Sequence, residues 1–344
     1  MKRLYRLLTN WEQWNFFVLY LPFFPVWCWY CIKSRSLWFF TASNPTITFG
    51  GLEGEGKKEM YAQLPSGWFP KTLYIEPKSD LSLAKQSIVD AGFGLPFVVK
   101  PDVGMKGILF RKIEQWEEWR DYHNIMPVTY MVQELIEYPL ELSIFYYRFP
   151  TDNSETISGC IQKELLHVVG NGHLTLEQLI AQHPRASLRF QEMKHRHASR
   201  FDWVVPSGER YYLSYAGNHN RGARFVSLMH EVDDRLVTFF DALSRQTSFY
   251  YGRYDLKCHS LETLKQGHSF SILEYNGCGA EPNHIYDAGL SLRQVYKILL
   301  QHWSVLFRIS AYNHQQGHRY WPFAKGWRFL KQARRHFAQL ESID

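Results

Sequence analysis

The sequence predicts a fold of mixed strands and helices, divided into two or three lobes, and three observations lead to this prediction. The chain has 344 residues, of which 45% are hydrophobic, and this length allows a large core in more than one lobe. From Pro70, where the strand-like segment PKTLYIEP begins, short strands and helices alternate until about residue 290. Residues 291–310 then carry the apolar periodicity of a long helix.

The charge and cysteine content narrow the class of protein. A formal charge of +6 favours anionic partners without choosing among nucleotides, acidic lipid and nucleic acid. We expect no nucleic-acid partner, because the basic residues are dispersed and no recognition module is present. Five scattered cysteines argue against a disulfide framework and predict a reducing compartment. Cys28 and Cys31 form a C-x-x-C pair among large apolar residues, which we interpret as two buried small residues.

Residues 1–40 form a hydrophobic, aromatic segment. Within it, residues 15–32 carry no charge, and as one helix they would be about 27 Å long, close to a bilayer core. Pro22 and Pro25 argue against a single straight helix. No small-x-small site follows, so a cleaved signal peptide is not predicted. Three interpretations remain open: a core or interface segment, a shallow membrane anchor, and a true membrane span.

Residues 291–344 are predicted to form the C-terminal helices. Near the end of the chain, apolar side chains fall on one helix face. They are Phe323, Trp327, Leu330, Ala333, Phe337 and Leu340. Basic residues take other positions, so this helix suits either acidic lipid or the protein's own core. Together, this helix and the N-terminal segment predict a cytoplasmic protein that sits on the inner face of a membrane without crossing it.

The stretch LPFVVKPDVGMKGILF, residues 95–110, is the first with a chemical signal. Lys100 ends a buried strand, and Gly104 and Gly107 occupy the turn that follows. Glycine backbone can approach phosphate oxygens closely, and the ammonium adds a point charge. The spacing does not fit a Walker A loop, and a β-hairpin with a surface lysine is the alternative.

The second stretch, residues 131–148, places three acidic residues in an apolar background. Glu134, Glu137 and Glu141 lie on a strand, a linker and a second strand. Such carboxylates can accept hydrogen bonds from an adenine amino group and a ribose hydroxyl. The alternative is a solvated sheet edge whose charges face water.

The third stretch carries the strongest signal. Asp255 lies inside the apolar strand FYYGRYDLKC, and Glu274 and Asn276 lie two residues apart on the strand SILEYN. Residues two apart on a strand share one face, so three oxygen ligands converge if the strands pair. Mg²⁺ prefers such ligands, and Arg253 lies on the same face as Asp255. Exposed charges on a solvated sheet are the alternative, although the flanking runs are strongly apolar.

These motifs together resemble the ATP-grasp superfamily. The R-x-D motif followed by E-x-N is similar to D-alanine–D-alanine ligases and to cyanophycin-synthetase-like ligases. The segment KELLHVVGNGHLTLEQLI resembles the V-x-G-D-G-x-x-T-x-x-x-L-I pattern of the second group, with Asn171 in place of the usual aspartate. The resemblance covers residues 71–287.

The resemblance implies an α+β fold in which two α/β lobes clasp a nucleotide. Residues 71–132 would form the first lobe, and residues 133–290 the second lobe with the metal site. Residues 41–70 would be an N-terminal region on the substrate side.

The resemblance also assigns residues to the nucleotide, here ATP. Lys100 and Lys163 would contact its phosphates, under a loop with Gly104, Lys106 and Gly107. The adenine pocket would be lined by Glu134, Leu135, Ile136 and Glu137, and Glu141 would hold the ribose.

The remaining assignments concern the metal, catalysis and the substrate. Asp255, Glu274 and Asn276 would bind one or two Mg²⁺ ions. Arg253 would steady an acyl phosphate, with Lys163 as the second catalytic cation. The candidates for substrate contact are Asn218, His219, Arg221, Gly277 and Glu281.

The implied function is an ATP- and Mg²⁺-dependent ligase that activates a carboxylate as an acyl phosphate for attack by an amine. The carboxylate and amine would be small molecules or lipid-linked, with an acidic membrane surface as a further partner. Two alternatives are a kinase-like phosphotransferase on the same fold and a membrane-surface regulatory protein that binds nucleotide.

Overall fold

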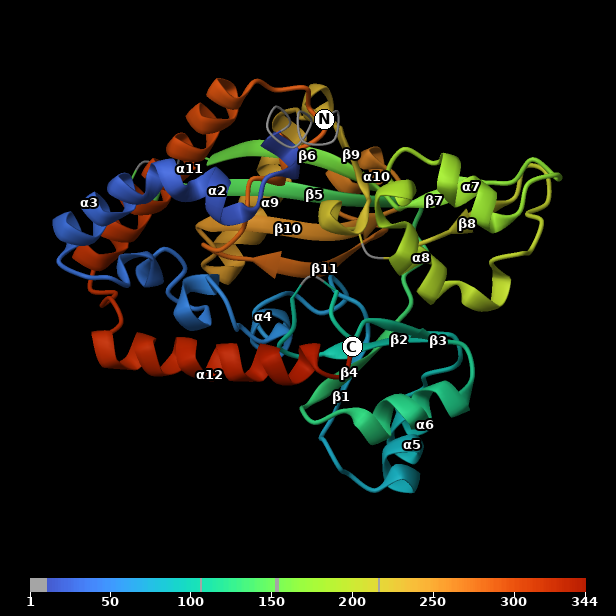
Figure 1. Ribbon diagram of the computed structural model, residues 1–344. Helices are drawn as coiled ribbons and strands as arrows, with labels where there is room; N and C mark the ends of the chain where they lie inside the picture. Colours follow the sequence, from blue (N-terminus) through green and yellow to red (C-terminus); the bar gives the residue numbers. More distant parts are fainter. Residues whose placement is uncertain (1–10, 106, 152–154, 216) are drawn as a thin grey trace.

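The fold is described from a computed structural model, for residues 11–105, 107–151, 155–215 and 217–344 (Figure 1). Its strands form sheets of four, five and two strands within these ranges, and every strand pairing among them is antiparallel. Helices pack on the faces of these sheets and are not interleaved between parallel strands, which defines an α+β protein. The predicted fold class is confirmed.

The first lobe is a four-stranded sheet, in the order β1-β4-β2-β3, covered on one face by two helices. Its elements are β1 (Thr72–Ile75), α5 (Leu81–Asp90), β2 (Phe97–Pro101), β3 (Arg111–Ile113), α6 (Trp116–Ile125) and β4 (Tyr130–Glu134). Ile88 of α5 and Trp119 of α6 pack against Phe97 and Val132 of the sheet. Asp80 caps α5 by accepting hydrogen bonds from two backbone N–H groups of its first turn.

The second lobe is a five-stranded sheet, in the order β11-β10-β5-β6-β9. Its elements are β5 (Leu140–Arg148), β6 (Glu155–Glu164), β9 (Arg224–Ser227), α9 (Asp234–Thr247), β10 (Tyr251–Cys258), α10 (Leu261–Lys265) and β11 (Phe270–Asn276). Phe240 and Leu243 of α9 pack with Tyr254 on one face of the sheet. The other face is turned toward the first lobe, and it carries the polar residues described below.

A small unit between β6 and β9 contains the segment with Asn171. It comprises β7 (His167–Val169), α7 (Leu176–Gln182), α8 (Phe190–Arg196) and β8 (Arg210–Tyr212) around its own core. The Asn171 Oδ1 atom accepts hydrogen bonds from the backbone N–H groups of His173 and Leu174, which forms the turn before α7. An amide oxygen makes these bonds as well as a carboxylate does, so asparagine can stand where related ligases have aspartate.

The aromatic N-terminal segment is helical. It contains α2 (Phe16–Tyr20), a 3-10 turn (Leu21–Phe23) and α3 (Phe24–Ser34). Pro22 and Pro25 stand in the first turns of their elements, where a missing N–H group is tolerated. By length and composition alone, this run could cross a membrane, and 11% of its most apolar window is buried. Cys28 and Cys31 are half-buried free thiols.

Two long helices complete the chain. They are α11 (Leu292–Gln315), which extends the predicted helix by five residues, and α12 (Phe323–Glu341). α11 packs against α2 and α3, whereas α12 begins next to Trp38 and runs to the first lobe (Figure 1). Leu340 of α12 is buried in the first-lobe core. The last helix therefore connects the N-terminal segment to the first lobe.

Residues 50–51 close the far end of β11. The backbone N–H groups of Cys278 and Gly279 donate to the carbonyl oxygens of Gly50 and Gly51. Gly51 has φ of +76°, and a Cβ atom there would lie 2.7 Å from the Cα atom of Gly277. The short α4 (Lys57–Tyr61) follows and packs on β11.

We expect Gly51→Ala to destabilise the protein by about 3 kcal/mol or more, because it adds a backbone clash to the cost of a left-handed alanine. Gly208→Ala is the matched control: its φ is +79° and nothing lies within 4 Å of the added Cβ atom. That variant should lose only about 1 kcal/mol. Chemical denaturation measures both, and equal losses would contradict the close packing of residue 51 on β11.

Candidate nucleotide and metal site

The strands β10 and β11 bring the predicted metal ligands to one face. Tyr254 points into the core of the second lobe, so its neighbours Arg253 and Asp255 point to the opposite face. In the pairing of the two strands, Asp255 lies opposite Glu274 and Arg253 lies opposite Asn276. The strands therefore pair in the register that sets two carboxylates and an amide at adjacent positions.

A β-bulge in β11 maintains this arrangement. The register shifts after Asp255, and Leu273 is the extra residue of the bulge. Ile272 and Tyr275 are both buried in the core, although their odd separation would place them on opposite faces of a regular strand. The bulge thus lets the apolar residues on both sides of Glu274 pack inward while its carboxylate faces Lys57.

The Asp255 carboxylate is the most heavily bonded group of the site. It accepts hydrogen bonds from Ser143 Oγ at 2.5 Å, from Arg253 Nε and Nη2 at 3.2 Å each, and from Asn276 Nδ2 at 3.2 Å. Lys163 Nζ lies 3.1 Å from its Oδ1 atom. Burial alone would raise the pKa of Asp255, but the charges of Arg253 and Lys163 outweigh it and hold that pKa well below its usual range.

Lys57, the first residue of α4, contacts the second carboxylate. Its Nζ atom lies 3.1 Å from Glu274 Oε1 and donates to the carbonyl oxygen of Gly104 at 3.2 Å. This buried ammonium therefore links the metal face of the second lobe to the glycine loop of the first lobe. Lys57 was not among the site residues predicted from the sequence. The available signal was the glycine-rich turn GEGKK, where Gly56 precedes a short helix.

Lys100 lies at the end of β2 and is desolvated. Its pKa is lowered to about 7, first because burial disfavours the charged form and then because Lys57 is near. Glu274 and Glu141 oppose this shift. Among the residues that the structure describes, the Lys100 ammonium has no hydrogen bond or ion pair. Two cations close to each other favour an anion such as a phosphate group.

Glu141 and Lys163 lie side by side next to this cluster. The Lys163 Nζ atom is 3.8 Å from Glu141 Oε1. Burial raises the pKa of Glu141, against the opposing effect of Lys163 and Lys257. A Cβ atom on Gly217 would clash with the Glu141 carboxylate, so the loop at Gly217 passes directly over it.

The predicted adenine hinge connects β4 to β5. Its Ile136 carbonyl oxygen accepts a hydrogen bond from Lys257 Nζ at 2.9 Å, which ties the hinge to β10. Glu134 and Glu137 are exposed, and the Glu134 carboxylate accepts only a long bond of 3.4 Å, from the backbone N–H of Lys71. Leu135 is half-buried. In the glycine loop, Gly107 has φ of +70°, and Lys106 lies outside the described residues.

Two of the predicted substrate residues follow β11. Gly277 packs against Gly51, as described above. The Glu281 carboxylate accepts hydrogen bonds from the hydroxyl groups of Tyr20 at 3.1 Å and Tyr286 at 2.9 Å. Its carbonyl oxygen accepts from Arg253 Nη1 at 2.9 Å. The N-terminal helix α2 thereby reaches the edge of the site through Tyr20.

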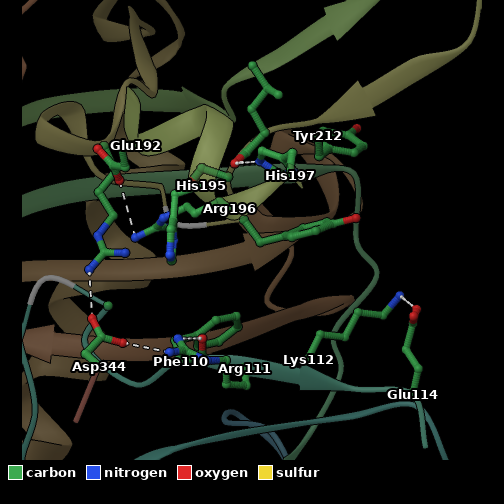
Figure 2. A pocket seen from close by; sticks show the side chains of 15 residues that line it. Phe110, Arg111, Lys112, Glu114, Glu192, His195, Arg196, His197, Tyr212 and Asp344 are labelled. Carbon is green, nitrogen blue, oxygen red and sulfur yellow. Dashed lines mark hydrogen bonds and ion pairs between the residues drawn. The ribbon is translucent and has the colours of Figure 1, made fainter. Parts of the chain in front are cut away.

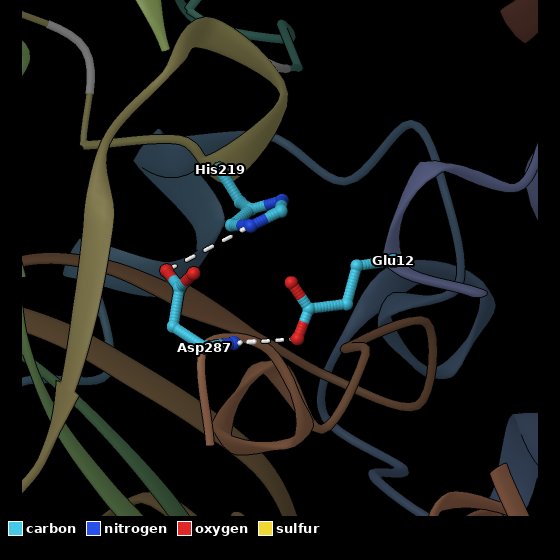
Figure 3. Close-up of side chains that lie close together, drawn as sticks. All are labelled: Glu12, His219 and Asp287. Atoms are coloured by element: carbon cyan, nitrogen blue, oxygen red, sulfur yellow. Dashed lines mark hydrogen bonds and ion pairs between the residues drawn. The ribbon is translucent and has the colours of Figure 1, made fainter. Parts of the chain in front are cut away.

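The other predicted substrate residues make different contacts. His219 Nε2 lies 3.7 Å from Asp287, and Glu12 is near both (Figure 3). Asp287 is already bonded to Arg185 of the small unit, which neutralises its charge. These side chains therefore join the small unit to the second lobe. The backbone carbonyl of Asn218 accepts hydrogen bonds within the same turn, and Arg221 lies 3.6 Å from Asp344.

A cavity of about 750 Å³ lies beside the glycine loop (Figure 2). It is lined by β3, α8 and β8, and by the end of the chain. Most of its cations are paired with carboxylates: Lys112 with Glu114, Arg196 with Glu192, and Arg111 and Arg221 with Asp344. The cavity is therefore polar but close to neutral.

Comparisons with known proteins give remote likenesses only. No protein-family model matches the chain, and no curated protein matches it. A D-alanine–D-alanine ligase from Coxiella burnetii is 8% identical over 78% of this chain and 60% of that one, with a TM-score of 0.43. The ligase of the same name from Bacillus anthracis, complexed with ATP, is 10% identical over 82% and 71%, with a TM-score of 0.41.

A bifunctional glutathione synthetase from Pasteurella multocida is 14% identical, with a TM-score of 0.36. The match covers 68% of this chain and 34% of the synthetase. This chain also spans 57% of the ATP-grasp ligase PsnB. These proteins include the ligases that the sequence motifs resemble. All these TM-scores lie below 0.5, so the likenesses are remote.

We expect binding of a non-hydrolysable ATP analogue to weaken as the pH rises above 7. Lys100, with a pKa of about 7, is charged below that pH, and a bound phosphate would favour the charged form. Binding at pH 7 should therefore take up a proton at this site. Calorimetry between pH 6 and 8.5 in buffers of different ionisation enthalpy measures both effects.

Lys100→Arg is the control for this pH dependence, because arginine stays charged throughout. Comparing it with the parent chain subtracts the titration of the nucleotide itself. Equal pH dependence in the two proteins would refute a phosphate contact through Lys100.

Two adjacent lysines provide a second test. Lys57→Ala should weaken binding of the same ATP analogue about ten- to a hundred-fold, since it removes a buried charge-assisted contact. Lys58→Ala, the matched control at an exposed neighbouring position, should leave affinity unchanged. Titration calorimetry distinguishes the two, and equal affinities would contradict the role of Lys57.

Proposed function

We propose that this chain is an ATP-grasp ligase that uses ATP and Mg²⁺ to join a carboxylate to an amine. The observation that carries the proposal is the close approach of a cluster of lysines to a cluster of carboxylates. Desolvated lysines at positions 57 and 100 face the carboxylates of Asp255 and Glu274. Cations that suit phosphates thus stand beside oxygen donors that suit a divalent metal.

The donor set fits Mg²⁺. Asp255, Glu274 and Asn276 offer hard oxygen atoms on two paired strands. Both carboxylates now contact an ammonium group, from Lys163 and Lys57, so positive charge already stands where a metal would bind. When bound there, Mg²⁺ would neutralise charge on the transferring phosphoryl group.

The protein's own residues would act by position and charge. Lys163 and Lys100 would hold the phosphate oxygens, which places the terminal phosphorus near an incoming substrate carboxylate. Arg253 is fixed by Asp255 and by the carbonyl oxygen of Glu281, on the same face of β10 as Asp255. It would stabilise the negative charge of an acyl phosphate while an amine attacks.

We place the reaction in the cytoplasm, where ATP and reduced thiols are available. The carboxylate and amine are small molecules or lipid-linked groups, held on the side of Glu281 and residues 41–70. A kinase-like phosphotransferase with a hydroxyl acceptor would use the same nucleotide site. The two activities differ in their products, and the test below separates them.

The test is hydroxylamine trapping. The protein is incubated with ATP, Mg²⁺ and pools of carboxylic acids, with hydroxylamine in place of the unknown amine. A ligase should yield ADP, free phosphate and a hydroxamate in equal amounts. ADP with a stable phosphorylated product and no hydroxamate would instead identify a phosphotransferase and refute the ligase.

Glu274→Gln should abolish this turnover while the melting temperature stays within a few degrees of the parent, because the side chain is partly exposed. Glu262→Gln, at an exposed carboxylate on the far side of β10, is the control and should remain active. Thermal shift with Mn²⁺ and the ATP analogue gives a readout besides activity. A normal rate for Glu274→Gln would refute its role as a metal ligand.

A further inference from the structure

The N-terminal helices expose an apolar surface to solvent. Phe17 is 78% exposed, Leu21 71% and Ile32 69%, and Phe16 and Phe24 are also exposed. A helix that is hydrophobic on all sides is normally buried on all sides. Here only one side of the run is covered, so the other side forms a contiguous apolar surface, which marks an interaction site.

The covered side packs on α11. Leu19 and Phe23 are buried against it, and the rings of Trp27 and Tyr30 contact Trp303 and Phe307. The run is thus held flat on the protein along its length. A helix held in this way would have to leave α11 before it could cross a bilayer.

The exposed surface continues onto α12. Leu37 is half exposed, and its neighbour Trp38 stacks on Phe323 and donates a hydrogen bond to the Phe323 carbonyl oxygen. Phe323 stacks in turn on Trp327, and both are about 60% exposed. Figure 1 places α3 and the start of α12 at the same edge of the molecule. We call the exposed residues of this edge the apolar edge: Phe16, Phe17, Leu21, Phe24, Ile32, Leu37, Phe323 and Trp327.

The charge of the chain is polarised toward this edge. Residues 13–52 and 288–340, which contain α2, α3, α11 and all of α12 except its last residue, Glu341, hold 11 lysines and arginines and no aspartate or glutamate. The rest of the chain holds 28 basic and 33 acidic residues. The elements that carry the apolar edge are therefore strongly cationic, although the catalytic body is slightly anionic.

We propose that the apolar edge docks the protein on the surface of an acidic lipid bilayer. Exposed Phe, Trp and Leu side chains enter the boundary between headgroups and acyl chains, and the surrounding lysines and arginines attract anionic headgroups. A second copy of the chain is a poorer occupant, because it would bring two cationic surfaces together. This proposal is independent of the proposed ligase activity.

The test is flotation of the full chain with vesicles. Vesicles of phosphatidylcholine with phosphatidylglycerol should carry the protein upward at low salt, and those of phosphatidylcholine alone should carry much less. The triple variant Phe17→Ser, Leu21→Ser, Phe24→Ser should reduce the partition coefficient about tenfold or more. Because these side chains are exposed, its melting temperature should match that of the parent.

The matched control is Leu83→Ser with Leu188→Ser, which removes equally exposed leucines away from the apolar edge. This variant should float like the parent. Failure of the parent to float with anionic vesicles, or equal flotation of the triple variant, would overturn the proposal. A dimer in light scattering that the triple variant abolishes, without flotation, would assign the edge to a second copy instead.

Discussion

The structure depends on a charged group buried in the middle of a sheet. Asp255 is held between Lys163 and Arg253 on the face of β10 opposite Tyr254, and removing both cations would leave its charge uncompensated, at a cost of about 3–5 kcal/mol or more. The opposite face of the same sheet is apolar and covered by α9. Every other part of the site is arranged around this carboxylate, including the bulge that keeps Glu274 beside it.

Because of this charge network, a substitution at Asp255 would change stability as well as activity. Removing its charge would disturb a metal site and, equally, two buried cations, so Asp255→Asn mixes stability with activity. Among the described residues, Glu274 forms one ion pair, with Lys57, and its side chain is partly exposed. Loss of activity there is the cleaner measure of metal binding, because the fold loses less.

Local periodicity explains how much of the site could be predicted. Glu274 and Asn276 lie two residues apart on an apolar strand, and that spacing alone fixes their common face. Lys57 was missed because it meets Glu274 only through the fold, across more than 200 residues of chain. The contacts of His219 with Asp287 were missed for the same reason. The composition of the N-terminal segment likewise could not decide between core and membrane contact. The sequence of an apolar helix does not tell whether the protein covers one of its sides or all of them.

The apolar edge is connected to the candidate site through direct contacts. α2 contributes Tyr20, whose hydroxyl bonds to Glu281, and Glu281 in turn holds Arg253 through its carbonyl oxygen. At the other side, α12 starts in the apolar edge and ends in the first-lobe core at Leu340. A bilayer that held these helices, as proposed, would therefore also fix the orientation of both lobes, so the residues around Asp255 would keep one distance from it. Such an arrangement would suit the proposed ligase if its substrate were presented from the same surface.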